Sequence, residues 1–170
     1  MTTCHCGTPI RTRPGPGRPA RHCSNACRQR YMRTRRRLPA ALTDRSRWTR
    51  HVAKRPVQLD GSPASSTNPS TWTTYLEAAA ATTGDGLGIM LGDGLGCWDF
   101  DHCLTADGLT ADVAALVASI SAPLWVERSL SGDGLHVFVA APEGPGRRRT
   151  GVEFYSRARF IVVTGDRFTP

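Results

Sequence analysis

Apolar and polar residues alternate clearly only in the C-terminal part of the chain, residues 71–170. Apolar side chains recur at helical spacing over 71–82 and 110–119, which predicts two helices. Short runs rich in β-branched and aromatic residues predict strands at 87–91, 95–101, 124–127, 135–140, 152–155 and 160–163. Because Gly-Asp-Gly separates the first two strands, we expect them to pair as a hairpin. The pattern as a whole predicts an α+β domain.

The part before residue 71 divides into two segments of different composition. Residues 1–37 hold four cysteines, a Pro/Gly/Arg-rich middle and an Arg-rich end. Residues 38–70 end in DGSPASSTNPS, which is too polar and too rich in turn formers to predict packing. We therefore expect a cysteine-rich basic module over 1–37, a connector over 38–70 and the α+β domain over 71–170.

Charge is unevenly distributed along the chain. Residues 1–60 carry 15 Lys and Arg against 2 Asp and Glu, whereas residues 61–170 carry 7 against 12. A basic head suits a polyanion such as nucleic acid, although a solvated basic tail has the same composition. We predict a basic helix over 25–37, in which Tyr31 could stack on a base and six arginines could bind DNA phosphates: Arg28, Arg30, Arg33, Arg35, Arg36 and Arg37.

Four cysteines near the N-terminus occur as two pairs, Cys4 with Cys6 and Cys23 with Cys27. Paired cysteines on either side of a Pro/Gly loop suit a tetrahedral Zn²⁺ site, and free thiols are the alternative. His5 and His22 adjoin the cysteines and could replace one as a ligand. The segment also resembles the small zinc modules found at the start of many actinobacterial proteins. It is therefore expected to be a zinc-finger-like module with structural Zn²⁺.

Two other features bear on location. The chain has no N-terminal apolar run typical of a signal peptide, and no apolar stretch long enough to span a membrane. We therefore expect a cytoplasmic protein without a membrane partner. In that compartment Cys97 and Cys103 are expected to be buried or idle thiols rather than a disulfide.

Two aspartates on one predicted strand suggest a metal site. Alternate side chains of a strand share a face, so Asp99 and Asp101 project to the same side. Two neighbouring carboxylates repel unless a cation or proton relieves them, and Mg²⁺ commonly binds through such a pair. Two solvated aspartates at a strand end are an equally acceptable interpretation.

Glu153 and His136 extend this candidate site. Glu153 lies in an otherwise apolar strand, where it could be a third carboxylate for two metals or could pair with Arg157 or Arg159. His136 follows a Ser/Gly-rich turn whose backbone and hydroxyls could bind a triphosphate. A hydrogen-bonded structural histidine is the alternative. The expected nucleotide-binding residues are Ser129, Ser131, Gly132 and His136.

In combination, these residues resemble the archaeo-eukaryotic primase superfamily. Asp99-Phe100-Asp101 resembles its DxD motif, Ser-Gly-Asp-Gly-Leu-His136 its Ser/His motif, and Glu153 stands where its third carboxylate is expected. The resemblance covers roughly residues 45–170 and is strongest to the N-terminal domain of bifunctional DNA primase/polymerases from actinobacterial phages and plasmids. Further matching segments are Lys54-Arg55-Pro56, residues 64–69, Trp72, Asp101-His102-Cys103 and residues 159–165.

The resemblance implies an RRM-like primase-polymerase core, a mixed sheet with flanking helices. It implies a nucleotidyltransferase that makes or extends primers in DNA replication, using Mg²⁺ or Mn²⁺ on Asp99, Asp101 and Glu153, with His136 on the nucleotide phosphates. Its partners would be a single-stranded DNA template or primer, nucleoside triphosphates and a replicative helicase.

Two departures from the family pattern leave an alternative open. The third carboxylate is often Asp rather than Glu, and the chain stops at Pro170, whereas relatives continue. A shortened catalytic domain is therefore one expectation. The other is a non-catalytic, zinc-containing DNA-binding protein derived from a primase.

Overall fold

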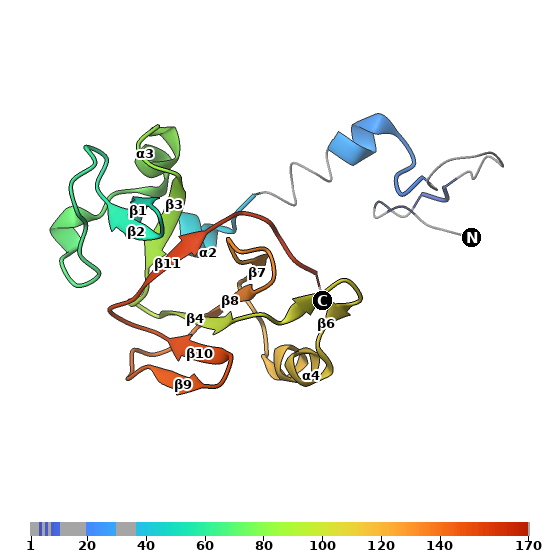
Figure 1. Ribbon diagram of the computed structural model, residues 1–170. Helices are drawn as coiled ribbons and strands as arrows, with labels where there is room; N and C mark the ends of the chain where they lie inside the picture. Colours follow the sequence, from blue (N-terminus) through green and yellow to red (C-terminus); the bar gives the residue numbers. More distant parts are fainter. Residues whose placement is uncertain (1–3, 5, 7, 11–19, 30–36, 170) are drawn as a thin grey trace. The chain divides into compact units, whose positions relative to one another are not determined.

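A computed structural model describes residues 4, 6, 8–10, 20–29 and 37–169 (Figure 1). The chain separates into two compact units, Met1–Arg37 and Leu38–Pro170. In the first unit, residues 25–29 are helical. Ser24 begins this helix, because its hydroxyl accepts a hydrogen bond from the Cys27 backbone N–H at 3.1 Å. Among the described residues of this unit, the buried apolar side chains are Cys4 and Ile10.

The second unit contains two larger antiparallel sheets, and their strands are visible in Figure 1. The four-stranded sheet has the order β11-β3-β1-β2. Its strands are β1 (Trp48–Val52), β2 (Arg55–Val57), β3 (Gly86–Met90) and β11 (Phe160–Val163).

The five-stranded sheet has the order β7-β8-β4-β10-β9. Its strands are β4 (Leu95–Phe100), β7 (Trp125–Arg128), β8 (Leu135–Ala140), β9 (Arg147–Arg149) and β10 (Val152–Tyr155). A separate two-stranded ribbon is formed by β5 (Leu104–Thr105) and β6 (Gly108–Leu109). The expected α+β fold is confirmed at this level, and most of its regular structure is sheet.

In the described residues of the second unit, helices are few and short. They are α2 (Ala40–Thr43), α3 (Tyr75–Ala80), α4 (Ala111–Ser119) and the 3₁₀ helix η1 (Pro69–Thr71). The helix predicted over 110–119 is α4, with Thr110 at its N-cap. The helix predicted over 71–82 is shorter, because Thr74 and Glu77 form a capping box that starts α3 at Tyr75. In the described part of the chain, no helix is both long and apolar enough to cross a membrane.

The predicted hairpin between the first two strands is wrong. The two strands exist as β3 and β4, but they belong to different sheets. Between them Gly92, Asp93 and Gly94 all have positive φ, and a single bridge joins Gly92 to Leu95. A glycine-rich turn permits a tight reversal, but here it carries the chain from one sheet to the other.

The segment expected to be a connector, residues 38–70, is folded into the second unit. It supplies α2, β1, β2 and η1, and β1 lies between β3 and β2 in the sheet. Trp48 is fully buried, and its indole N–H donates to the Leu42 carbonyl at 3.1 Å. The connector was predicted from the polar, turn-rich end of this segment. The strand signal of β1 was not recognised, because Arg50 and His51 obscure its apolar alternation.

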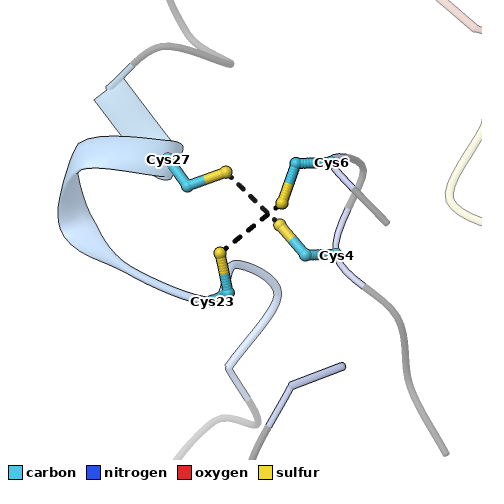
Figure 2. A group of neighbouring side chains, drawn as sticks. All are labelled: Cys4, Cys6, Cys23 and Cys27. Atoms are coloured by element: carbon cyan, nitrogen blue, oxygen red, sulfur yellow. Dashed lines mark hydrogen bonds between the residues drawn. The ribbon is translucent and has the colours of Figure 1, made fainter. Parts of the chain in front are cut away.

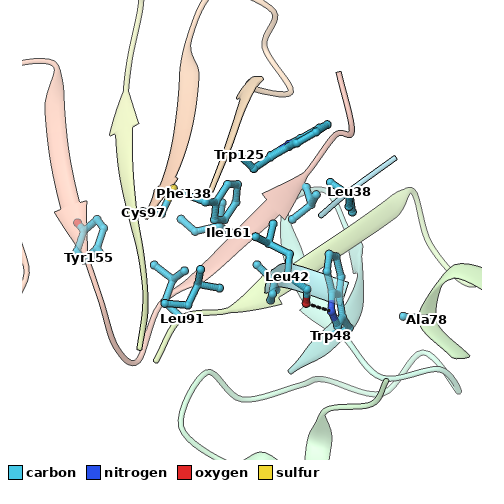
Figure 3. Packing of buried hydrophobic residues seen from close by; sticks show 13 residues of the cluster. Leu38, Leu42, Trp48, Ala78, Leu91, Cys97, Trp125, Phe138, Tyr155 and Ile161 are labelled. Atoms are coloured by element: carbon cyan, nitrogen blue, oxygen red, sulfur yellow. Dashed lines mark hydrogen bonds between the residues drawn. The ribbon is translucent and has the colours of Figure 1, made fainter. Parts of the chain in front are cut away.

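The core consists of two clusters, one on each face of the five-stranded sheet. The first joins that sheet to the four-stranded sheet and includes Trp125, Phe138, Cys97, Ile161 and Trp48 (Figure 3). The second contains residues of the opposite face together with α4 residues, among them Phe100, Val137, Val113 and Val117. Cys97 and Cys103 are both buried free cysteines, as the sequence predicts.

Candidate functional site

One residue from each strand of the five-stranded sheet contributes to a transverse row of polar side chains. Strand pairing places Glu127 opposite His136, His136 opposite Asp99, Asp99 opposite Glu153, and Glu153 opposite Arg148. Each of the first four lies two residues along its strand from a residue of the first core cluster, so the row lies on the face of the sheet that this cluster covers. We call these five residues the transverse row.

The transverse row borders a cleft of about 620 Å³. Its walls come from the five-stranded sheet, from β11 and from the β1–β2 hairpin with the loop that follows it. The lining includes six residues expected from the sequence: Asp99, Asp101, Ser129, Ser131, His136 and Glu153. Gly132, also expected from the sequence, is not among the lining residues; it lies in the turn directly after Ser131, with φ of +89°. Lys54 and Arg159 add positive charge to the lining.

Asp99 occupies the centre of the row in an unfavourable electrostatic environment. Burial raises the pKa of its carboxyl, and the negative charges of Asp101 and Glu153 raise it further. His136 and Arg159 act in the opposite direction, and His136 Nε2 lies 3.7 Å from Asp99 Oδ1. An additional cation in this cleft would therefore favour the ionised form of Asp99.

Glu153 is held by a group of side chains on its own side of the row. Arg148 Nε lies 3.3 Å from one carboxylate oxygen, and Arg159 lies 3.7 Å from the other. The Tyr155 hydroxyl donates to Glu153 at 2.7 Å and accepts from Arg148 at 2.6 Å. The salt bridge to Arg159 considered from the sequence is thus present. Sequence reasoning selected neither Arg148 nor Tyr155 for the site. Arg148 was missed because β9 consists of three arginines and carries no strand signal, whereas Tyr155 lies in the predicted strand β10.

On the other side of Asp99, His136 contacts a carboxylate that sequence reasoning did not select. Its Nδ1 lies 3.2 Å from Glu127 Oε1, and Glu127 is fully buried. The available signal was an acid inside the apolar strand Trp125-Val126-Glu127, the same signal that identified Glu153.

The turn before β8 is fixed by a chain of side-chain hydrogen bonds. Ser129 and Ser131 hydroxyls lie 2.9 Å apart, Ser131 donates to Asp133 at 2.5 Å, and Asp133 lies 2.6 Å from His102. The Ser131 and His102 contacts lower the pKa of Asp133, and Asp133 in turn raises the pKa of His102. At Gly134 an added Cβ would lie 2.6 Å from the Phe100 carbonyl oxygen, so the turn packs tightly against β4.

The four N-terminal cysteines form a compact sulfur cluster (Figure 2). Their Sγ atoms all lie within 4.8 Å of one another, with 3.5 Å between Cys4 and Cys27 and 3.6 Å between Cys6 and Cys23. Tetrahedral zinc with Zn–S bonds of about 2.3 Å separates its sulfurs by roughly 3.8 Å. The spacing therefore fits zinc, and all four cysteines are free of disulfides.

The thiols of this cluster differ in acidity. The Thr8 hydroxyl, 3.3 Å from Cys6 Sγ, holds the pKa of Cys6 at about 6. Partial burial raises the pKa of Cys27 to about 12, and the other sulfurs contribute to that rise. Four thiolates this close repel one another, and a divalent cation would stabilise them together.

The remaining N-terminal predictions are only partly described. Arg28 and Arg37 are exposed. The predictions for Arg30, Arg33, Arg35, Arg36, Tyr31 and His5 lie outside the described residues. Across the described ranges, the cysteine cluster is the one group of three or more side chains whose ligand atoms lie close enough together to hold a metal ion; these atoms lie within 4.8 Å of one another. Among those residues, the three carboxylates of the cleft do not form such a group.

No model of a known protein family matches the chain, and a search of curated proteins also finds no match.

Proposed function

We propose that the protein is a metal-dependent nucleotidyltransferase of the archaeo-eukaryotic primase superfamily, with an RRM-like core, that synthesises or extends primers on a DNA template. The observation that carries this proposal is the convergence of Asp99, Asp101, Glu153 and His136 on one cleft. These residues come from three strands and their ends, far apart in the sequence. A catalytic site of the kind that the family resemblance implies needs these side chains in one place.

The donor set of the cleft fits hard divalent cations. Asp99, Asp101 and Glu153 offer carboxylate oxygens, which Mg²⁺ and Mn²⁺ prefer. The raised pKa of Asp99 indicates that its negative charge lacks sufficient compensation from the protein alone. When bound, the metals would activate the primer 3′ oxygen and offset charge on the departing pyrophosphate.

The chain's own residues would bind and orient the triphosphate. His136 Nε2 lies on the Asp99 side of the imidazole, and the Ser129 and Ser131 hydroxyls line the same cleft. Lys54 and Arg159 would neutralise phosphate charge from the hairpin and from the segment before β11. Arg148 and Tyr155 would keep Glu153 oriented toward the cleft.

The N-terminal unit would serve as a zinc-stabilised DNA contact. Its four sulfurs have the spacing of a tetrahedral site, and Arg28 follows the last cysteine directly. Arginine side chains near such a site would bind the phosphate backbone without sequence preference. This contact would raise the local concentration of template at the cleft.

Primer extension on single-stranded DNA tests the proposal. The full chain is supplied with a primer, nucleoside triphosphates and Mg²⁺ or Mn²⁺, beside Asp99→Asn and Glu153→Gln. Asp107→Asn is the matched control, because Asp107 is an exposed acid outside the cleft lining. We expect extension by the wild type and the control only. Folded wild-type protein with bound zinc that extends no primer would contradict the proposal.

A second candidate is a non-catalytic, zinc-containing DNA-binding protein. The observation in its favour is that, in the described residues, ligand atoms cluster within 4.8 Å at the cysteines and not at the carboxylates. Under this alternative the protein would bind DNA in a salt-dependent manner with no extension. Asp99→Asn would leave the DNA affinity unchanged, and this can be measured by fluorescence anisotropy with a labelled oligonucleotide.

A further inference from the structure

The carboxylate of Glu127 is the most deeply buried acid of the transverse row. The residue has an exposed fraction of 0%, although burying a carboxylate is costly unless hydrogen bonds compensate it. It lies beside His136 at the β7 end of the row and does not line the cleft. Glu127 therefore contributes to the site through another residue.

Three N–H groups and the Nδ1 nitrogen of His136 converge on the two oxygens of Glu127. Oε1 lies 3.0 Å from the Thr164 backbone nitrogen and 3.2 Å from His136 Nδ1. Oε2 accepts from the Gly165 backbone N–H and the Trp125 indole N–H, each at 2.9 Å. An ionised carboxylate has about four acceptor positions and no donor, so this set of contacts uses its full capacity.

This arrangement determines which imidazole nitrogen faces the cleft. Since the Glu127 oxygens are already occupied by three N–H donors, His136 Nδ1 can join them only by donating its own hydrogen. The ring is then fixed with Nδ1–H toward Glu127 and Nε2 toward Asp99, 3.7 Å away. Without the carboxylate, nothing in these contacts would select that orientation.

We propose that Glu127 is a positioning residue for His136, which fixes the Nδ1–H tautomer and directs Nε2 into the cleft. The importance of this orientation for nucleotide binding rests on the proposed function. Nε2, which carries no hydrogen in this tautomer, would take up a proton and then donate a hydrogen bond to a triphosphate oxygen, while Glu127 accepts from Nδ1–H and compensates the charge of the imidazolium. Thr164 and Gly165 follow directly after β11, so the same carboxylate also ties the chain beyond β11 to β7 and β8. The geometry of His136 is thereby linked to the four-stranded sheet.

Glu127→Gln distinguishes this role, because the amide has one acceptor oxygen and one NH₂ group. If the NH₂ faced Gly165 and Trp125, two fixed N–H donors would oppose it. If it faced Thr164 and His136, only the Thr164 N–H would oppose it, since imidazole can move its hydrogen to Nε2. The variant is therefore expected to hold His136 as the Nε2–H tautomer.

The experiment is two-bond ¹H–¹⁵N NMR of the full, ¹⁵N-histidine-labelled chain, at a pH above which the histidine ¹⁵N shifts no longer change and the imidazoles are therefore neutral. A His136→Gln spectrum assigns the signal. We expect Nδ1–H in the wild type and a change to Nε2–H in Glu127→Gln. A wild-type Nε2–H signal would overturn the proposal, as would a folded Glu127→Gln variant that keeps the wild-type signal.

Trp125→Phe is the matched control, because it removes one donor to Glu127 and leaves the His136 contact. It should lower the melting temperature while keeping the Nδ1–H signal. In primer extension we expect a loss of about 10- to 100-fold for Glu127→Gln, typical of an outer residue that orients a functional histidine, and less than about twofold for Trp125→Phe. Equal loss in both variants would reduce Glu127 to a structural role. The NMR result holds or fails independently of any polymerase activity.

Discussion

Removal of zinc is expected to unfold the cysteine module and leave the larger unit folded. The described residues of Met1–Arg37 bury two apolar side chains, Cys4 and Ile10. Burying one isoleucine contributes about 1.5–3 kcal/mol, whereas ordering each residue costs about 1–2 kcal/mol. The buried isoleucine therefore offsets the ordering of only about two residues. A structural zinc contributes roughly 10–16 kcal/mol, several times the contribution of that isoleucine, so we expect the metal to decide whether the module folds.

The assay combines metal analysis with NMR of the full chain. We expect one zinc per chain, and dispersed amide signals for residues 20–29 that collapse when a strong chelator removes the metal. Signals of the five-stranded sheet should persist, because its core is made by Leu38–Pro170 alone. Cys27→Ser should behave like chelation, whereas Cys103→Ser, a buried thiol outside the cluster, should retain the zinc.

The refuting result is specific. A metal-free chain whose residues 20–29 keep their dispersed signals would show that the module folds without zinc. The sulfur spacing would then reflect thiol packing alone. Loss of the five-stranded sheet on chelation would instead show that the two units do not fold independently.

Three further predictions concern stability. The folded state raises the pKa of Asp99, so its charge opposes folding at neutral pH. Asp99→Asn should therefore increase the free energy of unfolding in urea by roughly 0.5–2 kcal/mol at pH 7, and this gain should vanish at low pH, where the acid is neutral in both states. A variant less stable than the wild type at pH 7 would refute this. Burial lowers the pKa of His51, whose Nδ1 has no hydrogen-bond partner among the described residues. The contribution of neutral His51 to stability should be complete above about pH 6.5 and should decline as the pH falls toward the pKa of the folded state. His51→Asn should flatten this decline in thermal melts. At Gly88 an added Cβ would collide with the Phe160 ring and lie 2.8 Å from the Ile161 carbonyl oxygen, so Gly88→Ala should cost about 1–3 kcal/mol, whereas Gly144→Ala, where space is open, should cost far less.

The sequence predicted best those strands in which one face is entirely apolar. The bounds of β8, β10 and β11 agree with the prediction. In β8 and β10, apolar residues such as Leu135, Val137 and Val139 recur with period two, whereas β11 is a run of four apolar residues. In β1, Arg50 interrupts the alternation; its guanidinium donates to the Thr83 carbonyl at 2.5 Å, a tertiary contact that no local pattern reveals. Composition therefore assigned a central strand to a connector.

The site was predictable where chemistry and alternation coincide, and not where tertiary pairing decides. Asp99, His136 and Glu153 each stand out as polar residues in apolar strands, and the structure brings them into one row. Glu127 has the same local signature, but its significance depends on Thr164 and Gly165, nearly forty residues later. Likewise, the chain leaves β3 for another sheet at a turn whose residues equally suit a hairpin.

The transverse row also constrains how the gene can vary in length. A one-residue insertion within β4, β8 or β10 would turn every following side chain of that strand to the opposite face of the sheet. Apolar residues such as Trp98, Val137 or Phe154 would then face the cleft in place of an acid or the histidine. Residues 141–146, which connect β8 to β9, carry no such requirement. In-frame length changes should therefore accumulate in that loop and be absent from the three strands. A library of single-codon insertions should therefore tolerate insertions at residues 141–146 and reject them within β4, β8 and β10.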